Sequence, residues 1–273
     1  MKKRLLGLLI ALGLSIPAYA SITVSPTKIE LNANKVRNNY ATCAIDVKGD
    51  PTKPMRFKAY TGYFKINNQA GMELVNSKDD PHDISKKVRF VPSEFTVAPG
   101  KSQKLRVNIA NIKSLPDGES RAIIFIEDVN AKEVNIPVST GIGAQLILKT
   151  RVGVPLYVDK GNFVKKADIE TLEIVKEGKS YFTKMKIVST GNSKIRYGGK
   201  VQIINGKKLI DEYAIEGKAI GDNNFYVAKQ SIKTNKIEEA GDYTVRVVLS
   251  YFDEKNNKKS IKKDAILQIK SEL

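Results

Sequence analysis

Few residues of this chain have the types and the spacing that catalysis or metal binding requires. His82 is the only histidine, and it lies in the run Lys-Asp-Asp-Pro-His-Asp, which is rich in turn-forming residues. Neither a Ser-His-Asp triad nor a histidine-rich metal site can be assembled around a single histidine in such a loop. We therefore expect His82 to be a solvated loop residue, and the sequence predicts a protein that is not an enzyme and needs no cofactor.

Two other sets of residues resemble binding motifs only in composition. Asp79, Asp80 and Asp83 offer the oxygen ligands that calcium prefers, but their spacing lacks the central glycine and the terminal glutamate of an EF-hand. Gly141 and Gly143 lack the third glycine of a dinucleotide-binding fingerprint, and they precede a strand-like run rather than a helix. Neither set predicts a metal or phosphate site.

The first twenty residues have the three parts of a secretory signal peptide. Positions 2–4 are basic, residues 5–14 form an apolar run, and Ala-Tyr-Ala at positions 18–20 is a cleavage site with small residues. The apolar run is about half as long as a membrane-spanning helix needs. We expect the mature protein to begin at Ser21 and to lack an integral membrane segment after cleavage; an uncleaved anchor is the alternative.

The chain is strongly basic, with 46 lysines and arginines, 29 acidic residues and a net charge of +17. Such a balance favours anionic partners and surfaces through long-range attraction. The aromatic residues do not alternate with basic ones in a stacking pattern, and the export signal also argues against nucleic acid. Lysines along exposed strands additionally protect sheet edges from unwanted pairing.

Cys43 is the only cysteine, so no disulfide can form within the chain. Burial of hydrophobic side chains has to supply the stability instead. Cys43 alternates with its neighbours inside a strand-like run, and we expect a buried thiol rather than a nucleophile.

Short runs of Val, Ile, Tyr, Phe and Thr alternate with polar residues along the mature chain, and Gly, Pro, Asn and Asp separate these runs. This pattern predicts an all-β protein. In the first half we expect seven strands, at residues 22–31, 40–47, 55–66, 87–91, 103–109, 121–127 and 142–157. Seven short strands are typical of an immunoglobulin-like β-sandwich.

The second half repeats this style, with strands expected at residues 169–175, 181–189, 195–204, 208–215, 224–231, 243–251 and 259–269. Asn205-Gly206, between two such runs, is a strong signal for a hairpin. We therefore predict two immunoglobulin-like sandwich domains, residues 21–158 and 159–273. A junction of about three residues near Gly161 should hold them at a fixed angle with a cleft between them.

The longest strand-like run, residues 142–158, is the most unusual stretch of the chain. Its even-numbered side chains are almost all apolar, which is the period of a strand, and at about 3.4 Å per residue it would extend roughly 50 Å. Either it bends at Gly153 and Pro155, or its first part carries an apolar row beyond its own domain. A loop of about fifteen residues, 128–142, precedes it, and loops of that length are generally functional or mobile.

Three segments of the first half resemble the periplasmic pilus-assembly chaperones of the PapD-like family. They are FVPSEFTVAPGKSQKLRV at residues 90–107, SLPDGESRAIIFIEDV at residues 114–129, and SPTKIEL at residues 25–31, which is similar to that family's first strand. The resemblance covers most of the first domain, whereas the second domain matches only as a β domain of suitable length.

This resemblance implies a boomerang-shaped, two-domain periplasmic chaperone. Such a protein lends its last first-domain strand to a pilin or fimbrial subunit, and then passes the subunit to an outer-membrane usher. The donor row implied here is Ala144, Leu146 and Leu148, starting at Ile142.

The family also anchors the subunit's C-terminal carboxylate with two basic residues. Lys28 corresponds to the first of them. The second falls on Gly153 in this chain, and Arg151 lies two residues earlier on the same face, an offset of about 7 Å that an arginine side chain could span.

A structural or adhesive protein of the cell surface, built of two β-sandwiches and binding anionic polymers, is the alternative from another functional class. Copurification separates the two, because a chaperone should leave the periplasm with a subunit bound. The sequence leaves open which subunits are bound, and whether the free protein self-associates to cover its apolar row.

Overall fold

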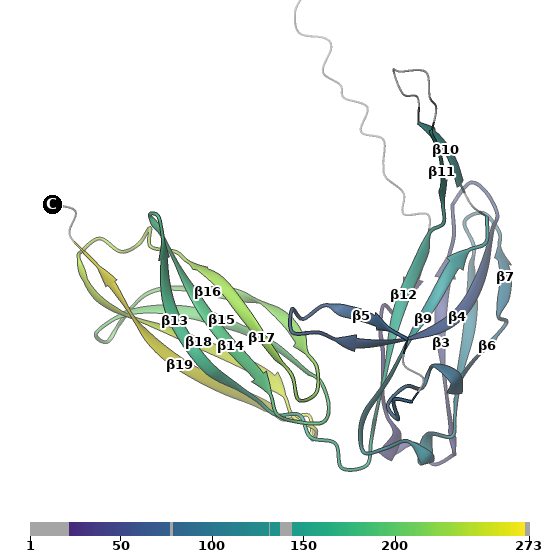
Figure 1. Ribbon diagram of the computed structural model, residues 1–273, viewed down its shortest axis with the longest axis horizontal. Helices are drawn as coiled ribbons and strands as arrows, with labels where there is room; N and C mark the ends of the chain where they lie inside the picture. Colours follow the sequence, from purple (N-terminus) through teal and green to yellow (C-terminus); the bar gives the residue numbers. More distant parts are fainter. Residues whose placement is uncertain (1–21, 77–78, 131, 137–143, 271–273) are drawn as a thin grey trace, which may run out of the picture.

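The computed structural model describes residues 22–76, 79–130, 132–136 and 144–270. Figure 1 shows two lobes set at an angle, with β1 to β12 in the first and β13 to β19 in the second. The described residues contain strands and three single-turn helices, and none of these helices is long and apolar enough to cross a membrane. The predicted fold class, all-β with two sandwiches, is confirmed.

Two sheets pack face to face in the first lobe. One sheet has the order β1-β3-β8-β6, and the other has the order β2-β12-β9-β4-β5, with β7 also paired to β4. The first sheet contains β1 (Thr23–Ser25), β3 (Tyr40–Lys48), β8 (Ser102–Ala110) and β6 (Val88–Val91). The second contains β2 (Ile29–Asn32), β12 (Arg151–Lys160), β9 (Gly118–Asp128), β4 (Met55–Ile66), β5 (Met72–Val75) and β7 (Glu94–Val97).

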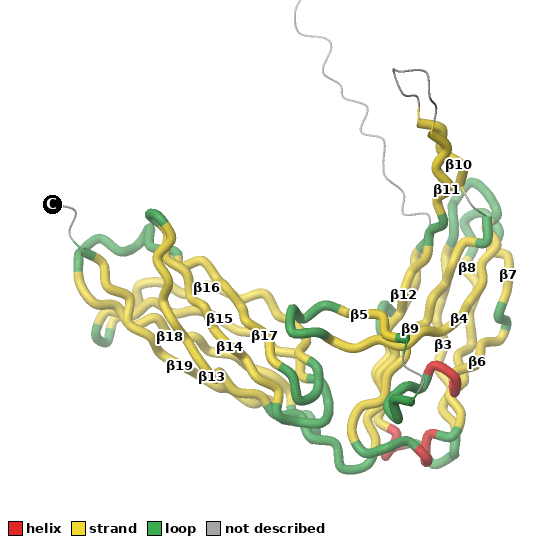
Figure 2. Tube along the Cα trace, in the orientation of Figure 1, coloured by secondary structure: helices red, strands yellow, loops and turns green. Residues whose placement is uncertain are grey.

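The core of the first lobe follows from the alternation of its strands. Even-numbered residues of β12 and β9, such as Val154, Leu156 and Ile124, are fully buried between the two sheets together with Phe57 and Leu105. Single helical turns, η1 (Ala33–Lys35), η2 (Ser85–Lys87) and η3 (Ile112–Ser114), lie at one end of the lobe. The strands β10 (Lys132–Ile136) and β11 (Ala144–Leu148) lie at the other end (Figure 2).

The segment expected as one strand at residues 22–31 is two strands in different sheets. β1 pairs antiparallel with β3, whereas β2 pairs parallel with β12. Pro26 follows β1 directly, and proline has no N–H to continue a ladder, so the chain can leave one sheet there and enter the other. Residues 22–31 therefore contribute one strand to each sheet of the sandwich.

The long run 142–158 is divided into β11 (Ala144–Leu148) and β12, with the break at residues 149–150 rather than at Gly153 and Pro155. The expectation of a loop at residues 128–142 was wrong in part, because β10 (Lys132–Ile136) lies within it and pairs with β11. Residues 137–143 lie outside the described part of the chain. In Figure 1 the β10–β11 hairpin extends beyond the two sheets of the first lobe.

The second lobe is also a sandwich, with sheets ordered β13-β14-β17 and β16-β15-β18-β19. All seven expected strands are present, as β13 (Ala167–Glu177), β14 (Ser180–Ser189), β15 (Ile195–Asn205), β16 (Lys208–Ile220), β17 (Phe225–Ile232), β18 (Gly241–Phe252) and β19 (Lys258–Ile269). The Asn205-Gly206 signal is confirmed as a hairpin, because Asn205 pairs with Lys208 and Gly206 has a φ of 57°.

The β4–β5 hairpin reaches from the first lobe to the second, where Figure 1 shows its tip beside the second sandwich. The Asn224 side chain donates a hydrogen bond of 2.8 Å to the carbonyl oxygen of Ile66, and Ala219 packs against the hydrophobic cluster that contains Ile66. β5 was not expected from the sequence, because its four residues carry too short an alternation to be distinguished from a loop.

Gly191 should be a position of close packing at the start of the second lobe, against the backbone of Val164. A Cβ atom there would overlap the carbonyl oxygen of Val164 and lie 2.7 Å from its carbonyl carbon, and backbone atoms cannot move aside cheaply. We expect Gly191→Ala to destabilise the protein by about 1–3 kcal/mol. Thermal and denaturant unfolding measure the change.

Gly198→Ala is the matched control, because an added Cβ would meet no atom within 4 Å. This variant should be at least as stable as the parent. Equal stability of the two variants would contradict the close packing described for Gly191.

Candidate functional site

The candidate site is the edge of β12 and β11 that faces away from β9 and β10. β12 pairs with β9 along its whole length, from Arg151 to Lys160, but β2 covers its other edge only from Leu156 to Asp159. β11 pairs only with β10 among the described residues. An edge from Ala144 to Pro155, interrupted at residues 149–150, is therefore open to another strand.

The side chains expected to form the donor row are only partly within the described structure. Ile142 lies outside it. Ala144, Leu146 and Leu148 belong to β11, whose backbone path is described but whose even-numbered side chains are not. On the odd face, Ile147 is 62% exposed, so β11 presents at least one apolar side chain to solvent.

The face of the β2-β12-β9-β4-β5 sheet that is turned away from the first core is apolar at its centre. Phe64, Ile123, Phe125 and Tyr157 form a cluster there, with Ile66 at the tip of β4 and with Tyr60 and Ala219 packed against it. Because Ala219 belongs to the second lobe, this surface is where the two lobes meet. We call it the inter-lobe face.

Arg151 lies at the upper end of this face, at the start of β12. Its guanidinium carbon is 4.5 Å from the centre of the Phe125 ring, and Nη1 donates a hydrogen bond of 3.2 Å to the Tyr60 hydroxyl. The Tyr60 hydroxyl in turn donates to Glu127 at 2.6 Å. Burial, together with the hydrogen bond to Glu127, raises the pKa of Tyr60, so the phenol remains a donor.

Lys28 lies at the other end of the open edge, one residue before β2. Its Nζ is 3.1 Å from Oε2 of Glu30, and both side chains are substantially exposed. Burial alone would raise the pKa of Glu30, but the charges of Lys194 and Lys28 and their hydrogen bonds lower it to about 2. Glu30 is therefore ionised at any ordinary pH.

The structure does not bring Lys28 and Arg151 together. Ile29, next to Lys28, pairs with Leu156, which is five residues or about 17 Å along the strand from Arg151. Gly153, where the family's second basic residue would fall, is also close-packed, because a Cβ there would be 2.7 Å from the Cδ1 atom of Ile123.

Below the inter-lobe face lies a buried network of charged side chains. Oε1 of Glu119 accepts from Nε of Arg121 at 2.7 Å, and Oε2 accepts from Nζ of Lys194 at 2.8 Å. Arg121 also pairs with Asp222 of the second lobe, and the Ser193 hydroxyl donates to Asp159 at 2.6 Å. Both lobes contribute to this network, so it holds them together.

No sequence pattern predicted this network or the part that the second lobe has in it. Glu119 and Arg121 occur in a segment quoted for its resemblance, but Lys194 and Arg196 belong to no motif. Their contacts depend on how the two lobes meet, which no local pattern encodes. The position of Lys194 is clear only in the folded protein. Its Nζ lies 3.5 Å from the centre of the Tyr157 ring and also makes the ion pair with Glu119.

The other candidate residues have structural roles. His82 lies in a turn, as expected, but it is half-buried rather than fully solvated, and its carbonyl oxygen accepts from the Arg121 N–H at 2.8 Å. Asp80 bonds Lys65 and Tyr63, and Asp83 accepts from the Ser85 N–H at 2.7 Å. In the described part of the chain no three potential ligands among His, Cys, Asp and Glu come together for a metal.

Cys43 is partly buried against the first core, and burial raises the pKa of its thiol to about 11, as expected for an unreactive cysteine. Gly141 and Gly143 lie outside the described residues.

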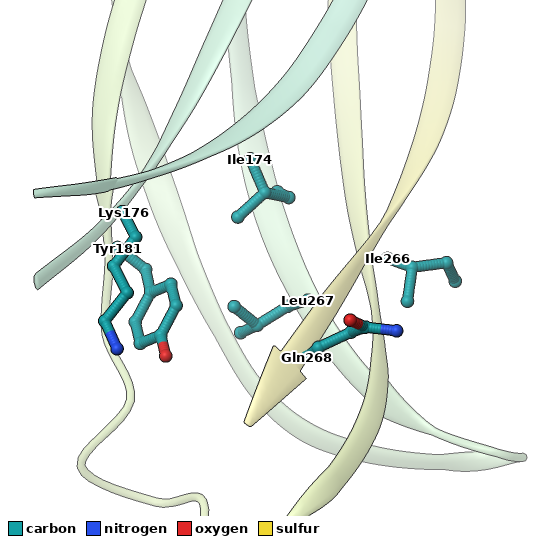
Figure 3. A pocket seen from close by; sticks show the side chains of 6 residues that line it. All are labelled: Ile174, Lys176, Tyr181, Ile266, Leu267 and Gln268. Atoms are coloured by element: carbon teal, nitrogen blue, oxygen red, sulfur yellow. The ribbon is translucent and has the colours of Figure 1, made fainter. Parts of the chain in front are cut away.

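A groove of about 390 Å³ occurs on the second lobe, between the edge strands β13 and β19 (Figure 3). Leu267 forms its floor, while Lys176 and Tyr181 stand together along one side. Lys176 Nζ lies 5.3 Å from the centre of the Tyr181 ring. The lining has one charged group and no acid–base pair, so it does not assemble a catalytic site.

No protein-family profile and no curated protein matches the chain. Solved structures match over most of its length. They include the YadV chaperone, at 11% identity, 90% coverage of this chain, 100% coverage of that chain and a TM-score of 0.46. The Pseudomonas aeruginosa CupB2 chaperone matches at 13% identity, with coverages of 90% and 100% and a TM-score of 0.40.

A third match is the Salmonella enterica SafA pilin in complex with the SafB chaperone, at 12% identity, with coverages of 91% and 96% and a TM-score of 0.39.

Lys194 should be essential for the junction of the lobes, because it neutralises a carboxylate that is fully buried. We expect Lys194→Ala to destabilise the protein by about 3–5 kcal/mol, since it leaves Glu119 with one charged partner fewer in the interior. Chemical denaturation of the parent and the variant measures the loss.

Lys200→Ala is the matched control, because Lys200 makes an ion pair of the same 2.8 Å length with Glu212 on an exposed surface. Removal of an exposed pair should change the stability by about 1 kcal/mol or less. A similar small effect for both variants would contradict the structural role of the buried network.

Proposed function

We propose that this chain is a periplasmic chaperone that binds pilus or fimbrial subunits by donating a β-strand and delivers them to an outer-membrane usher. The observation that carries the proposal is the open edge from Ala144 to Pro155. A strand there can form main-chain hydrogen bonds on one side while its other side remains part of the first lobe.

An open edge of this length is unusual in a soluble protein, because it invites aggregation unless a partner covers it. In β12 the free edge belongs to a strand whose core-facing residues are already buried, so the sandwich is complete without a partner. The edge is therefore available for a strand of another protein, with no need for the first lobe to unfold.

The donated side chains would be the continuation of the core-facing row of β12. Val152, Val154, Leu156 and Val158 face the first core, and the same alternation gives Leu148, Leu146 and Ala144 farther along, with Ile142 at the start of the predicted row. Burial of each leucine in a subunit's groove contributes roughly 1.5–3 kcal/mol. That gain supports strand donation as the source of affinity.

The two basic residues lie along the β12 part of the same edge. We propose that Lys28 and Arg151 engage the C-terminal part of the subunit, Lys28 at the end near β2 and Arg151 about 17 Å earlier along β12. Charge-assisted hydrogen bonds from these side chains would fix the register of the bound strand.

The remaining assignments follow from the sequence. The leader at residues 1–20 supports export to the periplasm, and the division into residues 21–158 and 159–273 assigns the donor strand to the first domain. Under this proposal the partners are subunits and an usher, with no nucleic acid and no catalysis. The free protein can cover its edge by self-association.

The double change Leu146→Glu and Leu148→Glu tests strand donation. Two carboxylates would be buried without partners when a subunit binds, at a cost of several kcal/mol. We expect the free variant to unfold at the temperature of the parent and to recover no subunit from the periplasm. Thermal unfolding and quantitative mass spectrometry of the copurified proteins measure the two effects.

The matched control places two glutamates on the opposite face, at Ile147 and Lys149. The yield of captured subunit should be higher for this control than for the Leu146→Glu, Leu148→Glu variant. If the change of Leu146 and Leu148 unfolds the free protein, the assignment of the even-numbered face as the donated face is wrong. If the parent protein itself recovers no subunit, the surface-protein alternative is favoured instead.

Lys28→Ala and Arg151→Ala test the basic residues. Each should lower the yield of captured subunit without changing the unfolding temperature, because both side chains are exposed and belong to no core. The expected loss for each is about tenfold in affinity, as for one charge-assisted hydrogen bond. A normal subunit yield with both residues changed together would show that neither engages the subunit.

A further inference from the structure

The end of the second lobe that lies away from the first lobe carries exposed apolar side chains (Figure 1). Leu209 of β16 and Ile266 of β19 are 51% and 55% exposed. Ile204 pairs with both Leu209 and Thr244, and Thr244 pairs with Ile266. Paired residues of neighbouring strands point to the same side of a sheet, so these four side chains form one row across the sheet. We call it the distal row.

The distal row lies on the outer face of its sheet. The sequence neighbours of its members, Ile203, Val245 and Leu267, are fully buried in the core of the second lobe, and successive side chains of a strand point to opposite faces. Among the described residues, β19 pairs only with β18, and β13 only with β14. No described strand therefore covers this end of the sheet from outside.

The groove between β13 and β19 continues the apolar surface around the edge of the sheet. Ile266 lines this groove as well as belonging to the distal row, and Leu267, Ile174 and Tyr181 lie beyond it (Figure 3). The apolar surface thus runs from β16 across the outer face and over the edge strand β19 to β13. Its shape is convex, because it turns around that edge.

Exposed lysines in the strand ends and turns surround this surface. They are Lys176, Lys179, Lys207, Lys208 and Lys270. None of them forms an ion pair with a carboxylate of the described residues, and Glu177, beside Lys176, pairs with Lys229 instead. Lys176 also lies over the ring of Tyr181, at 5.3 Å from its centre.

The acidic residues of the same end are fewer. Asp211 is buried and pairs with Lys236. Glu238, Glu239 and Asp242 are the carboxylates in these strand ends and turns that have no ion-pair partner among the described residues. The unpaired charge around the apolar surface is therefore positive on balance, and it complements an anionic partner.

Exposed aliphatic side chains bordered by lysines fit a layer that is anionic at its face and apolar beneath it. Lysine side chains lay their methylene groups along apolar surface and keep the ammonium group at the charged face, and tyrosine likewise has an apolar ring and a polar tip. A fluid layer of lipid adapts to a convex surface, whereas a folded protein would need a matching hollow. These features favour a membrane surface over an acidic protein.

We propose that this end of the second lobe binds the surface of membranes that contain anionic phospholipids. The lysines contact the headgroups, while Leu209 and Ile266 enter the boundary between headgroups and acyl chains. The inference does not depend on the proposed function, because the open edge of β11 and β12 belongs to the first lobe. A membrane and a partner strand can therefore be bound at the same time.

Single tryptophans test the contact, because the chain has none of its own. Ile266→Trp places a reporter in the distal row. Phe252→Trp is the matched control, since Phe252 is 56% exposed on the same face of the sheet but at the other end of β18. The full mature chain is mixed with vesicles of phosphatidylcholine alone, or of equal parts phosphatidylcholine and phosphatidylglycerol.

We expect the emission of Ile266→Trp to shift to shorter wavelength with the anionic vesicles only, and to be quenched by lipids with brominated acyl chains. The emission of Phe252→Trp should not change. Thermal unfolding of both variants should match the parent, because both positions are exposed.

Cosedimentation with the same vesicles tests the lysines. Lys207→Gln with Lys208→Gln should lower the partition coefficient roughly tenfold or more, since each lysine near an anionic surface contributes separately. Lys53→Gln with Lys101→Gln removes the same charge from exposed turns of the first lobe. That control should stay within about twofold of the parent, because charges farther than a Debye length of about 8 Å from the surface are screened.

Several results would overturn the proposal. Equal partition into neutral and anionic vesicles, or equal losses for the two lysine pairs, would show that these lysines have no special part. A wavelength shift of Phe252→Trp in place of Ile266→Trp would assign the contact to another surface. Displacement by inorganic phosphate, but not by chloride at the same ionic strength, would show a site for free phosphate. Binding of polyglutamate without binding of vesicles would assign the surface to an acidic protein.

Discussion

The length of the contact between β2 and β12 decides what the first lobe can do. β2 pairs with only four residues of β12, because the first part of the chain, β1, pairs with β3 in the other sheet. Had residues 22–31 formed one continuous strand beside β12, the edge from Arg151 to Pro155 would be closed. Because the chain divides at Pro26, one face of β12 is packed in the core of the first lobe while part of the edge of the same strand stays open.

This arrangement separates folding from binding. The core-facing residues of β12, from Val152 to Val158, are packed by the first lobe itself, so the strand is held in place before any partner arrives. β11 and β10 form only a two-stranded hairpin, and such a hairpin has little stability alone in water. A partner strand would add a third strand beside β11. The β11 part of the edge therefore gains the most stability from binding, because the rest of the lobe supports it least.

The sequence predicted features that depend on neighbours along the chain and missed those that depend on distant ones. The strand expected at residues 243–251 is present as part of β18, and its alternate residues Tyr243, Val245, Val247, Leu249 and Tyr251 are all buried. β10 was taken as part of a loop, because its five residues are stabilised by pairing with β11 rather than by an apolar face. His82 was expected in solvent, although the N–H of Arg121 binds its carbonyl oxygen and holds the loop against β9.

The buried charges at the junction explain why distant residues matter most for the site. Glu119 has a fully buried side chain, and an isolated carboxylate in the interior would be strongly unfavourable. Lys194 of the second lobe and Arg121 of the first neutralise the charge of this carboxylate. Moving the lobes apart would therefore expose these charges or leave them unpaired in the interior. Because Lys194 is fixed in this way, Arg196, two residues later in the chain, is held at Glu30 beside Lys28. The constraint that stabilises the angle between the lobes thus also brings basic residues from both of them to the end of the open edge.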